Sequence, residues 1–146
     1  MGSEMCIRDR FDLADSLPPV MTDPVGIRQV LNNLIINASD ALGDKGGELK
    51  LSTRIDHAKD NLLVLELQDN GPGFPAKLLD RIFEPYVTTK TSGSGLGLPI
   101  SRRIIEENGG TMRATNLPKG GAIVIIHLPV AQSQGASIDD RQGKRE

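Results

Sequence analysis

Two asparagines and an aspartate share one edge of a helix-like apolar stripe. These residues are Asn33, Asn37 and Asp40, spaced so that a helix places their side chains together. An amide oxygen is a hard, neutral ligand that suits Mg²⁺, an ion that keeps several waters and takes other oxygens from phosphates. The same pattern is also typical of amides that satisfy their hydrogen bonds at a helix surface. The spacing alone leaves both interpretations open.

A second candidate is the stretch DNGPGF, residues 69–74. Asp69 shares its strand phase with apolar residues, which places its carboxylate on the buried face; these residues are Leu63, Leu65 and Leu67. An unpaired buried carboxylate is costly, so Asp69 should have a partner. It could accept a hydrogen bond from the amino group of adenine, which the O6 position of guanine does not offer, while Gly71 and Gly73 let a ring approach. A surface turn is the alternative.

The third stretch is TTKTSGSGLGLPI, residues 88–100, with Gly93, Gly95 and Gly97 at every second position. Glycines allow backbone N–H groups to turn toward a ligand, and the predicted helix that follows carries about +0.5 charge at its N-terminus. Lys90 adds a formal positive charge. The pattern matches neither a P-loop nor a Rossmann fingerprint, because no GK[ST] follows and the spacing is G-x-G-x-G. It favours an anion site, although a flexible connector has a similar composition.

The elements that must position these residues follow from periodicity and capping. Asp23 and Pro24 predict the start of a helix whose apolar positions recur at helical spacing up to Leu42, and Gly43 can end it. Alternating apolar residues predict strands, and a helical pattern precedes Gly109 and Gly110. The further predicted segments are an antiparallel hairpin of 48–55 and 61–69, a helix over 99–108, and strands over 111–115 and 122–130.

Composition narrows the class of protein. The chain has 146 residues, 38% hydrophobic and 25% charged, which is typical of one soluble domain with a core. A net charge of -2 without a basic stripe argues against nucleic acid or an anionic membrane as the main partner. No apolar run approaches the roughly 20 residues of a membrane span. The single cysteine, Cys6, excludes an internal disulfide and fits a reducing compartment, so we expect a cytoplasmic location.

Four stretches in this order carry a resemblance to a known family. NNLIINASDAL, DNGPGF, FEPYVTTK and GSGLGL resemble the N, G1, F and G2 boxes of the GHKL ATP-binding fold, which sensor histidine kinases share with type II topoisomerases, heat-shock chaperones and mismatch-repair ATPases. The resemblance covers roughly 20–130 and looks most like the catalytic domain of nitrogen-regulation-type sensor kinases. It implies an α/β fold, a two-layer sandwich in which about three helices cover one face of a mixed, mostly antiparallel sheet.

The resemblance also implies roles for particular residues. Asn37 would be the Mg²⁺ ligand, Asp69 would hold the adenine amino group, and Lys90 would lie near the β or γ phosphate of ATP. Phe83 would anchor an ATP lid over roughly 74–96, and Gly120 and Gly121 would match a final glycine box. The complete set expected to bind the cofactor is Asn33, Asn37, Asp40, Asp69, Gly71, Gly73, Phe83, Thr89, Lys90, Gly93, Ser94, Gly95, Leu96 and Gly97, with Asn33 and Lys90 as the catalytic pair.

One position separates the branches of this family. Four residues before the metal asparagine, its ATPases carry a glutamate that activates water, whereas this chain has Asn33. An amide cannot accept that proton at neutral pH, so efficient hydrolysis lacks its base. Transfer to a histidine needs no such base, because the acceptor brings its own nucleophilic nitrogen. The sequence favours a histidine kinase; a serine kinase of the anti-sigma-factor type and a nucleotide-sensing module without transfer remain open.

The resemblance and the composition also predict domain limits and partners. Residues 1–10 are expected to be a non-native or disordered leader, 11–130 the catalytic domain, and 131–146 a disordered tail. The expected partners are a histidine-containing dimerisation domain of the same kinase and the receiver domain of a response regulator. Neither His57 nor His127 is in the sequence context of an acceptor histidine. The parent protein could be anchored in the inner membrane with this domain in the cytoplasm.

Overall fold

The computed structural model describes residues 7–13, 22–58, 61–85 and 97–130. Within these ranges the chain forms strands, two α-helices and two short 3-10 helices. In chain order they are β1 (Ile7–Asp12), α1 (Pro24–Leu42), η1 (Gly43–Lys45), β2 (Gly47–Asp56), β3 (Leu62–Asp69), η2 (Ala76–Arg81), α2 (Gly97–Glu107), β4 (Thr111–Asn116) and β5 (Ala122–Pro129). None of the helices in these ranges is long and apolar enough to cross a membrane.

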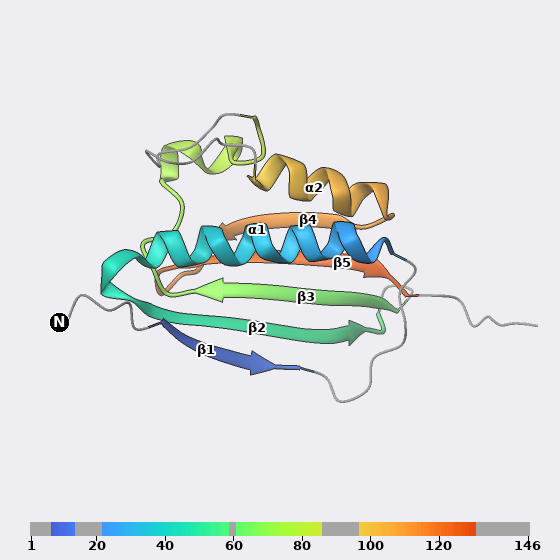
Figure 1. The fold of residues 1–146 in the computed structure, drawn as a ribbon, viewed down its shortest axis with the longest axis horizontal. Coiled ribbons are helices and arrows are strands. Elements are labelled where there is room, and N and C mark those ends of the chain that lie inside the picture. Colours follow the sequence, from blue (N-terminus) through green and yellow to red (C-terminus); the bar gives the residue numbers. More distant parts are fainter. Residues whose placement is uncertain (1–6, 14–21, 59–60, 86–96, 131–146) are drawn as a thin grey trace, which may run out of the picture.

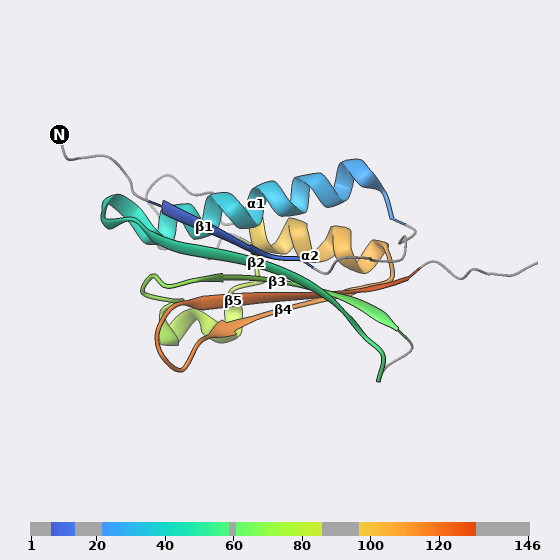
Figure 2. The same ribbon diagram turned by 90° about the horizontal axis from the view of Figure 1, so that it is seen from below.

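A five-stranded sheet forms one layer of the molecule, in the order β1-β2-β3-β5-β4. β1 pairs with β2 in parallel, and the other neighbouring strands are antiparallel. Helices α1 and α2 lie on the same face of this sheet, whereas η2 is a 3-10 helix on the connection between β3 and α2 (Figures 1 and 2). The predicted two-layer sandwich with a mixed, mostly antiparallel sheet is confirmed.

The sheet begins earlier in the chain than the predicted domain limit. We expected the domain to start at residue 11, but β1 starts at Ile7, which pairs with Gly47 of β2. Strand pairing is made by backbone groups and needs no side-chain periodicity at the edge of a sheet. The absence of an alternating pattern therefore did not exclude a strand here. Residues 1–6 and 131–146 lie outside the described residues, so the expected leader and tail stay predictions.

Helix α1 begins and ends where its capping residues predict. The Asp23 carboxylate accepts a hydrogen bond from the N–H of Val25 at 3.1 Å, and Pro24 occupies the first helical position. Gly43, with φ of 62°, ends the helix in a conformation that favours glycine. The buried positions follow the predicted spacing along one side: Val30, Leu34, Ala38 and Leu42.

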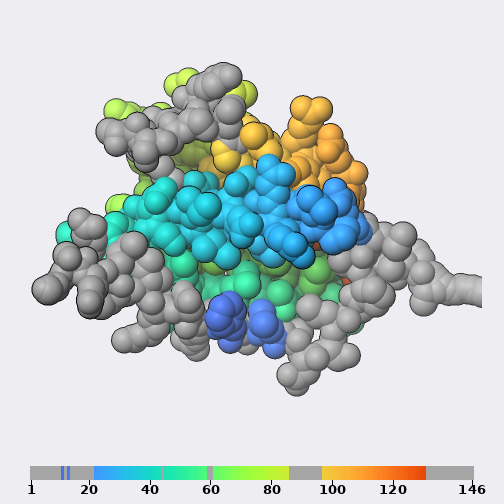
Figure 3. All heavy atoms as spheres, viewed as in Figure 1, coloured from blue at the N-terminus to red at the C-terminus, as the bar shows by residue number. Residues whose placement is uncertain are grey.

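The core fills the space between the two helices and the sheet. Leu34 of α1 and Ile105 of α2 are almost fully buried, as are Met112 of β4 and Ile126 of β5. In the space-filling view the atoms of α1 form a continuous band over this face of the sheet, with α2 beside it (Figure 3). Burying this apolar face is the main source of stability for a helix of this length.

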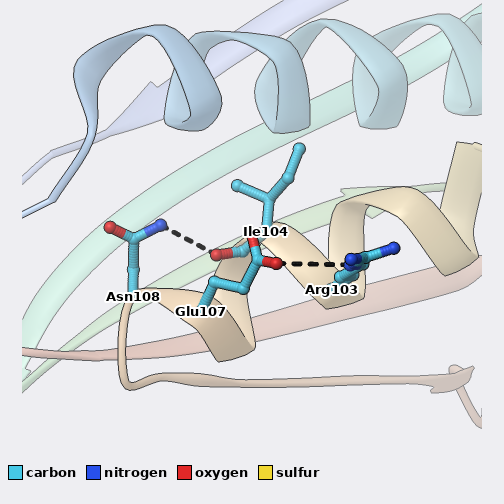
Figure 4. Close-up of polar contacts among 4 residues, drawn as sticks. All are labelled: Arg103, Ile104, Glu107 and Asn108. Carbon is cyan, nitrogen blue, oxygen red and sulfur yellow. Dashed lines mark hydrogen bonds and ion pairs between the residues drawn. The ribbon is translucent and has the colours of Figure 1, made fainter.

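The two α-helices run antiparallel, and one end of the pair is joined by Asn108. The side chain of Asn108 donates to the carbonyl of Ile104 at 2.8 Å (Figure 4). It also accepts from the backbone N–H of Asp23 at 3.0 Å. Close to this end, Gly26 lacks the Cβ that would lie 3.0 Å from the Ile104 side chain. This arrangement brings the second half of α1 beside the first turn of α2.

Candidate functional site

Asn37 lies against the first residue of α2. A Cβ placed on Gly97 would be 3.6 Å from Nδ2 of Asn37 and 3.9 Å from its Oδ1, so the half-buried amide lies beside the beginning of the helix. The first turn of an α-helix has backbone N–H groups without helical partners and carries partial positive charge. The fold thus brings the predicted metal ligand next to a backbone suited to an anion.

Asn33 is joined to α2 one turn away. Its Nδ2 donates to Oγ of Ser101 at 3.2 Å, and Ser101 is fully buried. The hydrogen bond fixes the separation of the helices beside Asn37 and Gly97. The same hydrogen bond occupies the side-chain NH₂ group of Asn33, the residue at the position where the resemblance places the glutamate of the ATPases.

Asp69 is the last residue of β3, and only 8% of its surface is exposed. Its Oδ1 accepts a hydrogen bond from the N–H of Gly71 at 2.9 Å, which confirms the prediction that this buried carboxylate has a partner. Burial raises the pKa of Asp69 above its usual value, and hydrogen bonds from the backbone of Gly71 and Ala122 partly offset that rise. An ionised carboxylate has about four lone-pair sites, so these two backbone hydrogen bonds leave capacity for a further donor.

The loop after Asp69 lies against the C-terminal half of α1. A Cβ on Gly71 would be 3.2 Å from the carbonyl oxygen of Ala41 and 3.2 Å from Oδ1 of Asp69. Ala41 is one helical turn beyond Asn37. The carboxylate predicted to bind the base and the amide predicted to bind the metal therefore lie toward the same end of α1.

Two glycines are needed for the close approach of backbone around Asp69. Gly121 has φ of 96°, and a Cβ there would overlap the carbonyl of Asp69. Gly73 has φ of 83°, and a Cβ there would come 2.7 Å from Oδ1 of Asn116. Most L-residues rarely adopt such φ values. The predicted final glycine box thus supports the strand end that carries Asp69.

Phe83 follows η2 and is half-buried against the hydrophobic core. The guanidinium carbon of Arg102 lies 4.5 Å from the centre of its ring, close enough for a cation–π interaction. Arg102 belongs to α2, so this contact ties the segment that contains Phe83 to the helix that begins at Gly97. The predicted anchoring role of Phe83 stays a prediction, because the lid it would anchor is described only over 74–85.

The remaining predicted site residue on α1 is Asp40. Asp40 lies on α1 three residues beyond Asn37 and is exposed. The remaining members of the predicted set lie outside the described residues, namely Thr89, Lys90, Gly93, Ser94, Gly95 and Leu96. Their roles stay predictions. The part of the chain that the structure describes holds no group of three or more histidine, cysteine, aspartate or glutamate side chains able to bind a metal.

Sequence reasoning missed Ser101, Arg102 and Asn116. Ser101 is a small polar residue on the buried side of a helix, a signal that could have pointed to a polar partner on a neighbouring element. Asn116 contacts a residue 42 positions earlier in the chain. No local pattern identifies such a contact.

A comparison of the sequence with protein families decides the classification. Residues 22–132 match the family described as histidine kinase-, DNA gyrase B-, and HSP90-like ATPase. The chain belongs to this ATPase family. The matched region contains α1, the sheet strands β2 to β5 and α2, and thus all the site residues described above.

The relatives of this ATPase-family domain include sensor histidine kinases. The sensory histidine kinase/phosphatase NtrB of Salmonella typhimurium is 39% identical over 126 residues, which are 82% of this chain and 36% of NtrB. The sensor histidine kinase ZraS of Klebsiella oxytoca is 35% identical over 133 residues, which are 91% of this chain and 27% of ZraS. The chain therefore spans about a third of these relatives or less. The resemblance to sensor histidine kinases is confirmed.

Solved structures of histidine kinases have the same fold. The nucleotide-free catalytic domain of histidine kinase ThkA is 34% identical, with a TM-score of 0.73 over 85% of this chain and 79% of that domain. Full-length ShkA in complex with AMPPNP is 28% identical, with a TM-score of 0.69 over 86% of this chain and 26% of ShkA. The fold and the sequence comparisons thus agree on the catalytic domain of a histidine kinase.

Proposed function

We propose that this chain binds Mg-ATP and transfers the γ-phosphoryl group to a histidine on a separate dimerisation domain of a two-component sensor kinase. One observation carries the proposal: the second half of α1 lies close both to the beginning of α2, at Asn37 and Gly97, and to the loop after Asp69, at Ala41 and Gly71. A single nucleotide with its base at one contact and its phosphates at the other fits this arrangement.

Asp69 and the glycines beside it would select the base. The Asp69 carboxylate would accept from the 6-amino group of adenine in addition to the backbone N–H groups of Gly71 and Ala122. Gly71 and Gly73 have little or no room for a Cβ against Asp69 and Asn116, which keeps the backbone of this loop close to the carboxylate. A buried carboxylate discriminates strongly against a base that presents an acceptor, since two facing acceptors would remain unpaired.

The beginning of α2 would bind the phosphates. Its N-terminal backbone N–H groups attract anions. Further backbone and side-chain donors are expected from Thr89, Lys90, Gly93, Ser94, Gly95, Leu96 and Gly97. The donor set fits Mg²⁺ rather than a transition metal, because the available protein ligand is an amide oxygen and the described residues hold no cluster of histidines or cysteines. Asn37 would hold the ion, which neutralises and orients phosphate oxygens when bound.

The transfer step would use an acceptor that this chain does not supply. A histidine ring nitrogen forms a bond to the γ phosphorus while the bond to the bridging β-phosphate oxygen breaks, and ADP leaves. Asn33 cannot act as a general base for water, and its Nδ2 is engaged with Ser101. We therefore propose that hydrolysis by the isolated chain is slow. His57 lies in a hairpin turn beside Asn61, and His127 lies within β5.

The partners and the location follow from the same proposal. The relatives are two-component sensor kinases, so the acceptor domain and the receiver domain of a response regulator are the proposed partners. We also propose a cytoplasmic location for this domain, since that is where Mg-ATP is available. The net charge of -2 gives no reason to propose a nucleic acid partner.

A transfer assay with labelled ATP tests the function. The chain should transfer ³²P from γ-labelled ATP to the histidine-containing dimerisation domain of its own parent kinase, and the label should be lost in acid and kept in base. An acid-stable label would support the serine-kinase alternative. Binding of ATP without any label transfer would support a nucleotide-sensing module, and rapid hydrolysis without an acceptor would support an ATPase.

Replacing Lys90 with alanine should weaken ATP more than ADP. A charge-assisted contact to the γ phosphate contributes about 1.5–3 kcal/mol, so ATP should lose roughly tenfold or more and ADP about twofold. Isothermal titration calorimetry with both nucleotides measures the difference. Lys45, an exposed lysine of η1, provides the control. Equal losses for ATP and ADP would remove Lys90 from the γ phosphate.

A further inference from the structure

We propose that Asn116 is a positioning residue for base recognition, which holds the DNGPGF loop in the shape that selects adenine. The inference rests on the proposed function, because it assigns the base to this loop. Asn116 is the last residue of β4, and β4 lies at the edge of the sheet two strands from β3. Its side chain reaches across the end of β5 to the loop that follows Asp69.

The contact is two-sided. Oδ1 of Asn116 accepts from the backbone N–H of Phe74 at 2.7 Å, and Nδ2 of the same side chain donates to the carbonyl of Phe74 at 2.9 Å. The amide thus pairs with both backbone groups of one residue, as a neighbouring strand would. A half-buried amide that satisfies two backbone groups fixes both the position and the orientation of that peptide.

The loop is closely fitted to this amide. Gly73, directly before Phe74, has no room for a Cβ, because its position lies 2.7 Å from Oδ1 of Asn116 and 3.2 Å from the carbonyl oxygen of Gly121. On the other side of the loop, Oδ1 of Asn70 accepts from the N–H of Glu48 in β2 at 2.8 Å. Two asparagine side chains therefore hold the loop, one toward β2 and one toward β4, with Asp69 and Gly71 between them.

Loss of the Asn116 side chain is expected to change the recognition of the base and not the binding of the phosphates. Gly71 and Gly73, which should line the ring, belong to the held loop, whereas Asn37 and Gly97 lie on the two α-helices. Releasing the loop should weaken the discrimination that depends on its exact position and leave phosphate binding nearly intact. A residue that merely contributed to folding would affect every nucleotide alike.

The test compares ATP with inosine triphosphate, which carries a carbonyl oxygen in place of the 6-amino group. Asn116→Ala should lower ATP affinity about tenfold and inosine triphosphate affinity by no more than about twofold, because two backbone hydrogen bonds that order the loop are lost. Titration calorimetry with both nucleotides gives the selectivity ratio. Charge effects on the shared triphosphate cancel in this ratio.

Asn108→Ala is a matched control. Asn108 is also a half-buried asparagine that accepts from one backbone N–H and donates to one backbone carbonyl, but at the end of the helix pair away from Asn37 (Figure 4). It should lower the melting temperature by a similar amount and leave the selectivity ratio unchanged. Equal ratios in the wild type and in Asn116→Ala would overturn the proposal.

A second variant keeps the test decisive if Asn116→Ala does not fold. Asn116→Asp keeps the acceptor for the Phe74 N–H and loses the donor to its carbonyl, so the ratio should fall again. An unchanged ratio in this variant would also overturn the proposal. Absence of ATP binding by the wild-type chain would instead contradict the proposed function itself.

Discussion

Asn37→Ala is expected to abolish magnesium-dependent ATP binding. The amide of Asn37 is the described side chain with an oxygen beside the beginning of α2, where the phosphates should lie. Loss of residues that only support a metal ligand costs roughly 10–100-fold in metal affinity, so loss of the ligand itself should cost at least about a hundredfold.

Titration calorimetry with and without Mg²⁺ measures this effect. The wild type should bind ATP far more tightly with the ion, and Asn37→Ala should show the same weak affinity in both conditions. Asn32 is an exposed asparagine of the same helix, and Asn32→Ala should behave as wild type. An Asn37→Ala titration that matches the wild type with Mg²⁺ would refute the metal role.

Asp69→Asn should weaken ATP strongly without weakening the fold. Asparagine keeps an oxygen for the Gly71 N–H, but its NH₂ group would face the amino group of adenine, donor against donor. The lost charge-assisted hydrogen bond is worth about 1.5–3 kcal/mol, or roughly ten- to hundredfold in affinity. Circular dichroism should show an unchanged spectrum.

The pH dependence of the stability of the chain tests independently whether the Asp69 carboxylate is buried. Because burial raises the pKa of Asp69 in the folded state, the folded chain binds the proton more tightly than the unfolded chain. The resulting stability is fully present below the unfolded pKa of about 3.9 and is lost as the pH rises through the raised folded pKa. At neutral pH the Asn variant should therefore melt at or above the wild-type temperature, with a flatter pH profile above about pH 4.

Asp56 provides the matched control for Asp69. It ends β2, its Oδ1 also accepts from the N–H two residues ahead, at 3.0 Å, and it lies at the opposite end of the β2–β3 pair. Asp56→Asn should change neither ATP affinity nor the selectivity for adenine. Asp69→Asn with wild-type affinity and an intact spectrum would remove the carboxylate from base recognition.

The sequence predicted those elements that are determined by residues close together in the chain. The caps at Asp23 and Gly43 defined α1, and alternation located the β2–β3 hairpin and the buried phase of Asp69. Each of these depends on residues within a few positions of one another. The order of the four resembling stretches then predicted the family, which no single motif could have done.

What the sequence did not predict depends on contacts between distant segments. β1 was left out of the fold because a parallel edge strand has no turn beside its partner and needs no alternating pattern. The antiparallel helix pair depends on Asn108 meeting Asp23 and on Asn33 meeting Ser101, residues far apart in the chain. Asn116 reaches its loop for the same reason. These contacts become visible only when the sheet order is known.

The central claim is that one nucleotide contacts α1, the loop after Asp69 and the beginning of α2 at the same time. Titration of the ¹⁵N-labelled chain with Mg-ATP, followed by two-dimensional NMR, tests it most directly. The backbone signals of Gly71, Gly73 and Gly97 and the side-chain amide of Asn37 should shift together with one dissociation constant. Shifts that leave either the loop or the helix unaffected, or that follow two different constants, would contradict the account.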